Sequence, residues 1–472
     1  MPTLLLNLYS GHPLLATPSP LKAPIIAAKR LPNKKQTRMI RSIARQLELP
    51  FCVLAGAVYR RRLVPNRFSR KIDQEEPDMT HAVLMSTYGR LPITFARGEG
   101  VWLYDDSGKR YMDAISGIGV NALGHSHPAV TAAITAQAGK LLHTSNLYNI
   151  ERQQLLAEKL CAVSGMDDVF FCNSGAEANE AAIKLARLYG HKKDIEKPTI
   201  IVMDKAFHGR TLATLTASGN RKIQAGFEPL VSGFVRAPFG DAEAIRNIAA
   251  NNPNIVAILV EPIQGEGGLH VPGDDYFKAL REICDANDWL LMLDEVQTGN
   301  GRTGTYFAAQ GFGIQADVIT TAKGLGNGLP IGACLARGKA ADVFQPGNHG
   351  STFGGNPLVC AAGTAVVDTI VNEKLCDNAK RIGSLLRDVF TQRLGKLAGV
   401  NEIRGRGLMI GMELDRPCGE LVKQAIAEGL LINVTAEKVV RLLPPLIMTQ
   451  SEAQQLADTL CPLIENFLHT NA

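Results

Sequence analysis

The chain has 472 residues, 46% of them hydrophobic and 20% charged, which is ordinary for a soluble globular protein of two or three domains. No uninterrupted apolar stretch approaches about 18 residues, so the sequence predicts no membrane span. The nine cysteines include no CxxC pair. This cysteine usage favours reduced thiols in a cytoplasmic compartment over a disulfide framework or a zinc site.

The formal net charge of +5 comes from the start of the chain. Residues 1–78 hold 14 Lys and Arg against 5 Asp and Glu, a charge of +9, so the other 394 residues carry −4. A nucleic-acid interpretation would therefore rest on this first segment alone.

Three interpretations of residues 1–78 compete. The first is an organellar transit peptide, because such peptides are basic and poor in acidic residues, and the protein would then be organellar. The second is a basic interaction arm. The third is an artefact of a start site assigned too far upstream, with translation beginning at Met79 or Met85 and a cytoplasmic protein as the result. We favour the start site, because the stretch is apolar yet has no clear period.

Residues 100–111 predict a hairpin with its turn at 105–108. From about residue 160, short apolar runs alternate with helical stretches, which predicts a mainly parallel sheet covered by helices on both faces. We expect a helix over 176–189, ended by Gly190 just after its last turn, and another around 276–287. The expected strands are 168–172, 199–203, 255–260, 290–293 and 318–320.

After about residue 365 the pattern changes. A long amphipathic helix precedes strand-like stretches at 407–413 and 430–434 and then a final helix, which predicts a smaller α+β domain. The expected organisation is an extension (1–78), a first segment of the small domain (79–130), a large domain (131–360) and the rest of the small domain (361–472).

Two residues in these patterns indicate chemistry. The apolar run 290–293 delivers Asp294 to the end of a buried strand, and Lys323 precedes a glycine-rich turn. A carboxylate against a pyridinium nitrogen and a lysine that forms a Schiff base are what pyridoxal phosphate chemistry requires. A lone lysine is usually a solvated surface residue, whereas the pair in these contexts is far more specific.

The surrounding motifs each have two interpretations. The Ser174–Glu177 turn suits a phosphate at a helix N-terminus and equally a capping box, and the two can coexist. Phe207 suits a ring stack or an ordinary core, and Arg210 a carboxylate clamp or an exposed arginine. The loop 351–356 offers hydroxyls to a phosphate or is only a turn. The histidines of 124–128 favour a turn over a metal site, so we expect no metal.

Together these stretches resemble the class III, omega-type aminotransferases of the pyridoxal phosphate fold-type I superfamily, over roughly residues 85 to 470. The resemblance implies an α/β fold in which a large domain, with a mainly parallel seven-stranded sheet sandwiched by helices, joins a smaller α+β domain built from the N- and C-terminal segments. The motifs that carry it are NSGAEANEAAIK (173–184), FHGRT (207–211), EPIQGEGG (261–268), LDEVQTGNGRTG (293–304), TTAKGLGNGLPIGA (320–333) and STFGGNP (351–357).

The resemblance also implies roles for individual residues. Lys323 would bind pyridoxal 5'-phosphate covalently and then move the proton as general base and acid, while Asp294 would keep the pyridine nitrogen protonated. The other cofactor-binding residues would be Gly175 and Ala176 at the phosphate, Phe207 on the ring, Gln297 at the ring hydroxyl, Glu295 and Val296 in the same stretch, and Thr352 from the neighbouring subunit. The active site would thus be shared across a homodimer.

For the substrates, the resemblance is strongest to members that act on N-acetylornithine, through GVNALGHSHP (119–128) and LLHTSNLY (141–148). Arg210 and Ser351 would clamp the donor's α-carboxylate, and Arg441 would bind that of 2-oxoglutarate. Glu266 would pair with Arg441 while the ω-amino donor is bound, because an unpaired buried guanidinium is costly and would attract any α-carboxylate.

Other members of the scaffold remain alternatives. Ornithine, succinylornithine and 4-aminobutyrate aminotransferases share the Lys and Asp and differ in the pocket. For the member that acts on N-acetylornithine, the resemblance also implies an overlapping activity on N-succinyl-diaminopimelate. Glutamate-1-semialdehyde aminomutase would need no 2-oxoglutarate. A non-catalytic protein on this scaffold fits poorly with an intact Lys323, Asp294 and Arg210. A nicotinamide dehydrogenase also fits poorly, because no GxGxxG opens a strand–helix unit.

Overall fold

The structure is a computed structural model that describes residues 84–470. The interpretations of residues 1–78 lie outside the described residues. The chain divides after Arg90 into two units, and residues 84–90 of the first contain no helix or strand. All helices and strands of the described residues belong to the second unit, which begins at Leu91. Within the described residues, none of the helices has the length and apolar character needed to cross a membrane.

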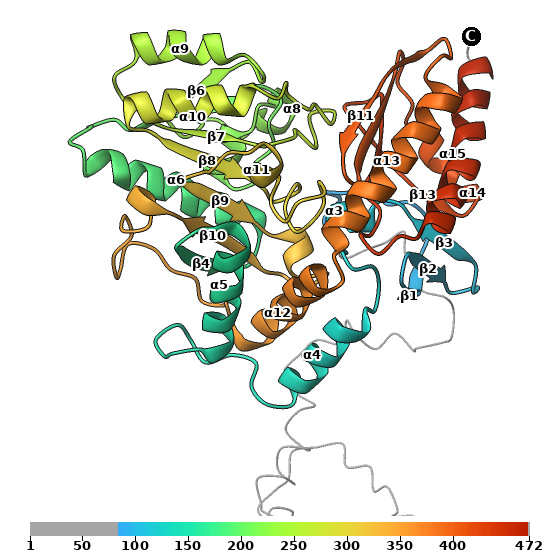
Figure 1. The fold of residues 1–472 in the computed structure, drawn as a ribbon, viewed down its shortest axis with the longest axis horizontal. Coiled ribbons are helices and arrows are strands. Elements are labelled where there is room, and N and C mark those ends of the chain that lie inside the picture. Colours follow the sequence, from blue (N-terminus) through green and yellow to red (C-terminus); the bar gives the residue numbers. More distant parts are fainter. Residues whose placement is uncertain (1–83, 471–472) are drawn as a thin grey trace, which may run out of the picture. The chain divides into compact units, whose positions relative to one another are not determined.

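A seven-stranded sheet forms the centre of the larger part of this second unit (Figure 1). Strand β10 runs antiparallel to both its neighbours, β4 and β9, and the other neighbouring pairs are parallel. This confirms the expected mainly parallel sheet. In spatial order the strands are β4 (Asp168–Cys172), β10 (Gly332–Ala336), β9 (Val318–Thr321), β8 (Leu290–Asp294), β7 (Ile255–Val260), β5 (Thr199–Met203) and β6 (Phe234–Ala237).

Both faces of this sheet are buried. Successive strand side chains point to opposite faces, and in β7 Ala257 and Leu259 pack in one hydrophobic cluster while Ile258 and Val260 pack in another. The first cluster includes apolar residues of helix α6 (Gly175–His191), and the second includes those of α10 (Tyr276–Asn287). Helices on both faces explain why the central strands are apolar throughout rather than alternating.

The remaining helices of the larger part pack around this sandwich. Helix α12 (Pro357–Asn372) packs against α4 (Pro128–Ala138) and α5 (Glu151–Ser164). The shorter elements are α3 (Ser116–Gly119), α7 (Leu212–Ala217), α8 (Arg221–Gln224), α9 (Ala242–Asn251), α11 (Ala308–Gly311), η2 (Lys323–Leu325) and η3 (Gly338–Ala340).

The smaller part joins the two ends of the described chain. The strands β1 (Phe95–Glu99), β2 (Trp102–Asp105) and β3 (Arg110–Asp113) form one sheet with β13 (Leu430–Leu431), which pairs parallel with β3. The predicted hairpin is thus confirmed as β2 and β3. A second sheet has the order β11 (Val400–Arg406), β12 (Met409–Leu414), β15 (Val439–Leu442) and β14 (Asn433–Thr435). The helices here are α13 (Leu375–Leu394), α14 (Glu420–Ala427) and α15 (Gln450–Thr470).

One predicted helix end is wrong. Helix α6 continues through Gly190 to His191 instead of ending before this glycine. A Cβ at Gly190 would lie 2.7 Å from Val256 Cγ1 and 2.8 Å from Pro198 Cβ. The glycine therefore allows close packing of the helix on the sheet and does not terminate the helix.

Candidate active site

A cavity of about 440 Å³ lies at the carboxyl ends of the large sheet's strands. Strands β7, β8 and β9 each bring one residue to the cavity at or just after their carboxyl end, as expected for parallel strands. Asp294 ends β8, Glu261 follows β7, and Lys323 follows β9. The cavity is lined by nine residues expected from the sequence: Gly175, Ala176, Phe207, Arg210, Glu266, Asp294, Val296, Gln297 and Lys323.

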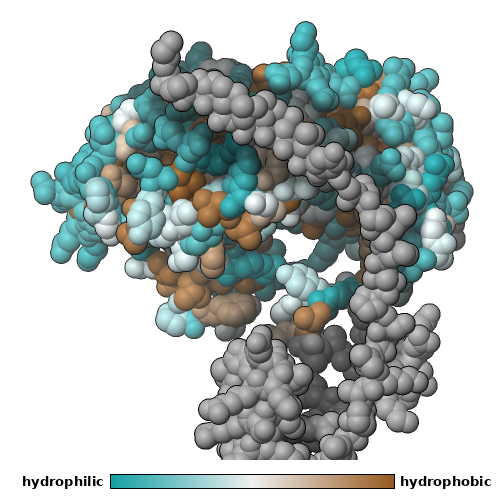
Figure 2. Space-filling model, turned by 90° about the horizontal axis from the view of Figure 1, so that it is seen from below, coloured by the Kyte–Doolittle hydropathy of each residue, from teal (hydrophilic) through white to brown (hydrophobic). Residues whose placement is uncertain are grey.

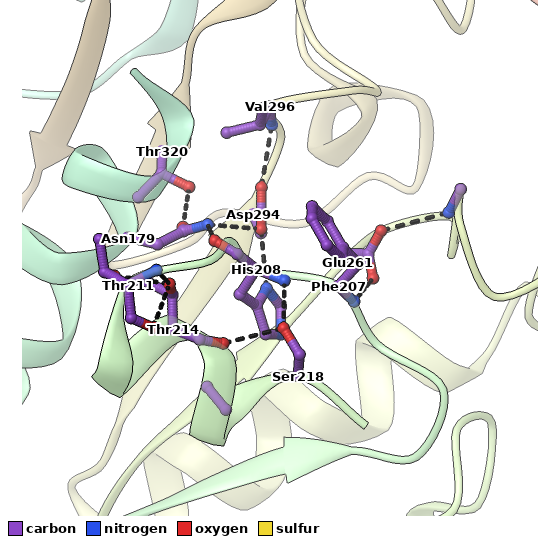
Figure 3. Close-up of polar contacts among 12 residues, drawn as sticks. Asn179, Phe207, His208, Thr211, Thr214, Ser218, Glu261, Asp294, Val296 and Thr320 are labelled. Atoms are coloured by element: carbon purple, nitrogen blue, oxygen red, sulfur yellow. Dashed lines mark hydrogen bonds and ion pairs between the residues drawn. The ribbon is translucent and has the colours of Figure 1, made fainter. Parts of the chain in front are cut away.

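Asp294 is held by buried donors (Figure 3). Its Oδ2 accepts hydrogen bonds from Asn179 Nδ2 and His208 Nδ1, both at 2.7 Å, and its Oδ1 accepts from the Val296 N–H at 3.1 Å. Asn179 is itself fixed, because its Oδ1 accepts from Thr320 Oγ1 at 2.7 Å. These three donors fix the position and orientation of the Asp294 carboxylate.

Asn179 and His208 were missed by the sequence interpretation. Both lie inside the motifs that carry the family resemblance, at 173–184 and 207–211. The motifs indicate that these residues matter, but they do not indicate that the two side chains contact Asp294. Only the fold shows that helix α6 and the segment after β5 both reach the end of β8.

Lys323 faces the cavity from a strained stretch of backbone. It lies in the short helix η2 with φ +42°, a left-handed conformation that a non-glycine residue adopts at some cost in energy. Burial lowers the pKa of its ammonium group, the Glu266 carboxylate opposes this effect, and the Arg441 guanidinium adds to it. A lowered pKa increases the share of neutral amine, which is the nucleophilic form.

Glu261 joins two walls of the cavity and was also missed. Its Oε1 accepts from the Phe207 N–H at 2.9 Å, and its Oε2 accepts from the Gly265 N–H at 3.2 Å. Burial raises the pKa of this carboxyl group to about 7. Glu261 therefore fixes the segment that carries Phe207 to the loop that carries Glu266.

The start of α6 forms another wall. Ser174 Oγ accepts from the Glu177 N–H at 3.2 Å, but the Glu177 carboxylate reaches back to the Asn173 N–H, at 2.5 Å, rather than to Ser174. The first N–H groups of a helix have no partner within it, and here that turn faces the cavity. A Cβ at Gly175 would lie 2.7 Å from Val296 Cγ1, so only glycine allows this approach. Capping and anion binding are thus compatible at one helix end.

Glu266 and Arg441 come together from different parts of the chain. Arg441, on β15, is only 1% exposed, and its Nη1 donates to Glu266 Oε1 at 2.5 Å. Burial alone would raise the pKa of the Glu266 carboxyl, but the charge and hydrogen bond of Arg441, together with Lys323 and Gln297, lower this pKa. Asn433, which the sequence interpretation did not include, accepts from Arg441 Nε at 3.0 Å and from Nη2 at 2.7 Å.

Besides Arg441, which pairs with Glu266 but does not line the cavity itself, three expected site residues lie outside the lining. Glu295 does not line the cavity, because its carboxylate accepts from the N–H groups of Ala308 and Ala309 and so caps α11. Thr352 is exposed, and Ser351 is half-buried with its Oγ 3.2 Å from Asn173 Nδ2. Neither of these two lines the cavity of its own chain.

The groups around the cavity fit pyridoxal phosphate. A buried, well-supported carboxylate suits a protonated ring nitrogen, an amine with a lowered pKa suits covalent attachment, and a helix start without a Cβ suits a phosphate. Phe207 adds an aromatic wall, and the Arg210 guanidinium lies 5.7 Å from the centre of its ring.

Comparison with known proteins agrees with this chemistry. The family model described as "Aminotransferase class-III" matches residues 84–464. The acetylornithine aminotransferase of Nitrosomonas europaea is 58% identical over 392 residues, which cover 83% of this chain and 99% of that protein. A relative of the same name from Aquifex aeolicus is 49% identical over 378 residues, 80% of this chain and 98% of that protein.

Solved structures are similar as well. An ornithine aminotransferase from Toxoplasma gondii, described with partial occupancy of PLP at its active site, has a TM-score of 0.78 and 34% identity, covering 82% of this chain and 94% of that one. The acetylornithine aminotransferase of Elizabethkingia anophelis has a TM-score of 0.73 and 34% identity, covering 81% and 96%.

Proposed function

Because the chain belongs to the class III aminotransferases, we propose that it transfers the δ-amino group of N2-acetyl-L-ornithine to 2-oxoglutarate, a step of arginine biosynthesis. The products are N-acetylglutamate 5-semialdehyde and glutamate. The observation that carries this proposal is the pair of the buried Arg441 and the half-buried Glu266, whose charges both act on the amine of Lys323. A guanidinium that a carboxylate can cover or expose suits a site that takes an ω-amino donor and a dicarboxylate acceptor in turn. The names of the relatives support the choice of donor.

The reaction divides between the cofactor and the side chains. When bound, pyridoxal phosphate supplies the carbonyl group that receives the amino group and the ring that accepts the electrons of the substrate carbanion. Lys323 Nζ anchors the cofactor and moves the proton from and to the reacting carbon. The Asp294 carboxylate would keep the ring nitrogen protonated, and Asn179 and His208 hold this carboxylate in place. Gln297, in the cavity wall, would hold the ring hydroxyl, and the backbone of Gly175 and Ala176 would hold the phosphate.

The two substrates use different guanidinium groups. Arg210, exposed at the cavity wall, binds the α-carboxylate of N-acetylornithine, whose reacting amine is at the other end. Ser351, which the sequence also assigned to this carboxylate, lies outside the cavity lining of its own chain. Glu266 covers Arg441 during this half-reaction. When 2-oxoglutarate enters, its α-carboxylate replaces the Glu266 carboxylate at Arg441, so that a charged group always faces the guanidinium.

A homodimer is part of this proposal. Thr352 is exposed on its own chain, where a partner's phosphate site can use its hydroxyl. Large apolar side chains are exposed after α4 and beside Thr352, as is typical of protein interfaces. They are Leu141, Leu142, Leu147, Tyr148 and Phe353. Figure 2 shows hydrophobic residues gathered on one face of the molecule. A cytoplasmic location is supported by the eight free thiols among the described residues.

Lys323→Ala tests the proposed chemistry. The variant should bind pyridoxal phosphate without covalent attachment and lose at least about a thousandfold in kcat, because its proton carrier is gone. Borohydride reduction followed by peptide mass spectrometry measures the attachment, and glutamate formation measures kcat. Lys205→Ala, at an exposed lysine outside the cavity lining, is the control. Near-normal turnover by Lys323→Ala would refute the assignment.

A further inference from the structure

Arg441 has two kinds of partner on different edges of its guanidinium group. The Nε and Nη2 edge donates to Asn433 Oδ1, at 3.0 and 2.7 Å, and Nη1 donates to Glu266 Oε1, at 2.5 Å. The first partner is a neutral amide and the second is a carboxylate. Of these two, Glu266 lines the cavity, where its side chain is 36% exposed. A second neutral amide, the Gln297 Oε1 in the cavity wall, lies 3.5 Å from Arg441 Nη1.

The sheet fixes the position of Asn433. Strands β14 and β15 pair antiparallel, with Asn433 directly opposite Arg441. Directly opposed residues of an antiparallel pair have their Cβ atoms about 5 Å apart, so the amide reaches the guanidinium without help from a loop. Asn433 thus orients Arg441 whatever the side chain of Glu266 does.

The same strand also anchors the loop of Glu266. Thr435 Oγ1 donates to the Glu266 carbonyl oxygen at 2.7 Å, and Arg404 Nε donates to the Leu269 carbonyl oxygen at 3.0 Å. The backbone of this loop is therefore held against the smaller part of the unit. Exposing Arg441 to a substrate requires only a rotation of the Glu266 side chain and no movement of the loop.

The neutrality of Asn433 has a consequence for binding. A carboxylate at this position would pair with the Nε and Nη2 edge permanently and cancel the charge that a substrate must find. The amide oxygen orients the guanidinium and leaves its charge whole, so the full attraction goes to the group at Nη1. That group is Glu266 in one half-reaction and a substrate carboxylate in the other.

We propose that Asn433 is a positioning residue that orients Arg441 while preserving its charge, and that it thereby sets the affinity for the α-carboxylate of the dicarboxylate acceptor. The inference rests on the proposed function for the order in which the substrates meet Arg441. It assigns Asn433 no part in binding the ω-amino donor, whose carboxylate lies at the other end of the molecule.

Asn433→Asp in the holoenzyme is the test, because the substitution keeps the shape and adds one negative charge. We expect the KM for 2-oxoglutarate to rise about tenfold or more, as when a charge-assisted hydrogen bond is lost. The Kd of glutarate, an unreactive dicarboxylate, measured by calorimetry should rise in parallel. The KM for N-acetylornithine and the rate of its single-turnover half-reaction should stay within about twofold. Asn401→Asp adds the same charge to an exposed position of the same sheet and is the matched control.

Two results would overturn the proposal. One is an unchanged KM for 2-oxoglutarate with an unchanged Kd for glutarate. The other is an equal rise in the KM of donor and acceptor, which a purely structural role would produce. Should Asn433→Asp not fold, Asn433→Ala removes the orienting oxygen without adding charge and must show the same selective loss. Failure of the wild type to use N-acetylornithine would contradict the proposed function instead, and the glutarate comparison would still decide the role of Asn433.

Discussion

Glu266 is the side chain whose partner must change during the proposed reaction. Its carboxylate covers a guanidinium that is otherwise buried, with Asn433 and Gln297 as the remaining oxygen partners, the latter at 3.5 Å. A buried cation left open would attract the α-carboxylate of any amino acid. The pair therefore protects the donor half-reaction from competitors.

Glu266→Ala should weaken this discrimination. Amino acids that react through the α-amino group, such as alanine, should gain at least about tenfold in kcat/KM relative to N-acetylornithine, because Arg441 is then open to their carboxylates. Steady-state kinetics with both donors at fixed 2-oxoglutarate measures the ratio. Glu402→Ala removes an exposed carboxylate from Arg404 and is the control. An unchanged ratio would contradict the role of Glu266.

The same carboxylate predicts a pH effect on stability. Arg441 lowers the pKa of folded Glu266 below its ordinary value of 4.5, so the folded state binds its proton less readily than the unfolded state. The stabilisation that the Glu266–Arg441 pair gives the folded state is then complete above pH 4.5. It is lost as the pH falls through the lower pKa that Glu266 has in the folded state. Wild type should unfold at a higher temperature than Glu266→Gln at pH 7, and the difference should shrink below pH 4.5. A difference that stays constant or grows on acidification would contradict the pair.

At the scale of elements, five of the seven strands of the large sheet were predictable and two were not. Strands β4, β5, β7, β8 and β9 lie where the sequence predicts them, because buried parallel strands are apolar throughout. Strands β6 and β10 were not predicted. β10 is apolar throughout, but Gly332 and Ala333 have low strand propensity, and Arg236 interrupts the apolar residues of β6.

Site residues were predictable where a recognisable sequence motif indicates the role of the side chain. Lys323, Asp294 and the Glu266–Arg441 pair follow from spacing and resemblance, because each lies in a recognisable stretch. Asn433 was not predictable, since its role depends on the register between β14 and β15. Glu295 was misplaced because neighbouring residues after a strand point in opposite directions, one into the cavity and the other toward α11.

The packing of α6 on the sheet gives a prediction for Gly190. Gly190→Ala should lower the free energy of unfolding by about 1–3 kcal/mol, because its Cβ would overlap Val256 and Pro198. Urea unfolding of the holoenzyme measures this change. Gly273→Ala is the matched control, since a Cβ there meets nothing within 4 Å. If the two variants were equally stable, Gly190 would not be a packing glycine.

At the scale of the whole molecule, the proposal requires two copies of the chain. Leu147 is 86% exposed, and its neighbour Tyr148 is 68% exposed. Surfaces of this kind mark protein interfaces when they are contiguous. Thr352 adds a functional reason for association, because it does not line the cavity of its own chain.

Leu147→Asp should shift the protein from dimer to monomer, because burying a charge in an apolar interface is costly. Sedimentation velocity measures the mass, and activity at the same concentrations should fall with the dimer fraction. Gln424→Asp, at an exposed position of α14, is the control. A fully active monomer would contradict the shared active site.

The most direct test of the proposed function measures the product formed per active site in each half-reaction. Purified holoenzyme is mixed with N-acetylornithine alone, freed from excess donor, and then given 2-oxoglutarate. We predict about one N-acetylglutamate 5-semialdehyde per active site in the first step and one glutamate in the second, since one cofactor carries one amino group. No product from N-acetylornithine, with stoichiometric transfer from ornithine or 4-aminobutyrate instead, would contradict the proposed substrate.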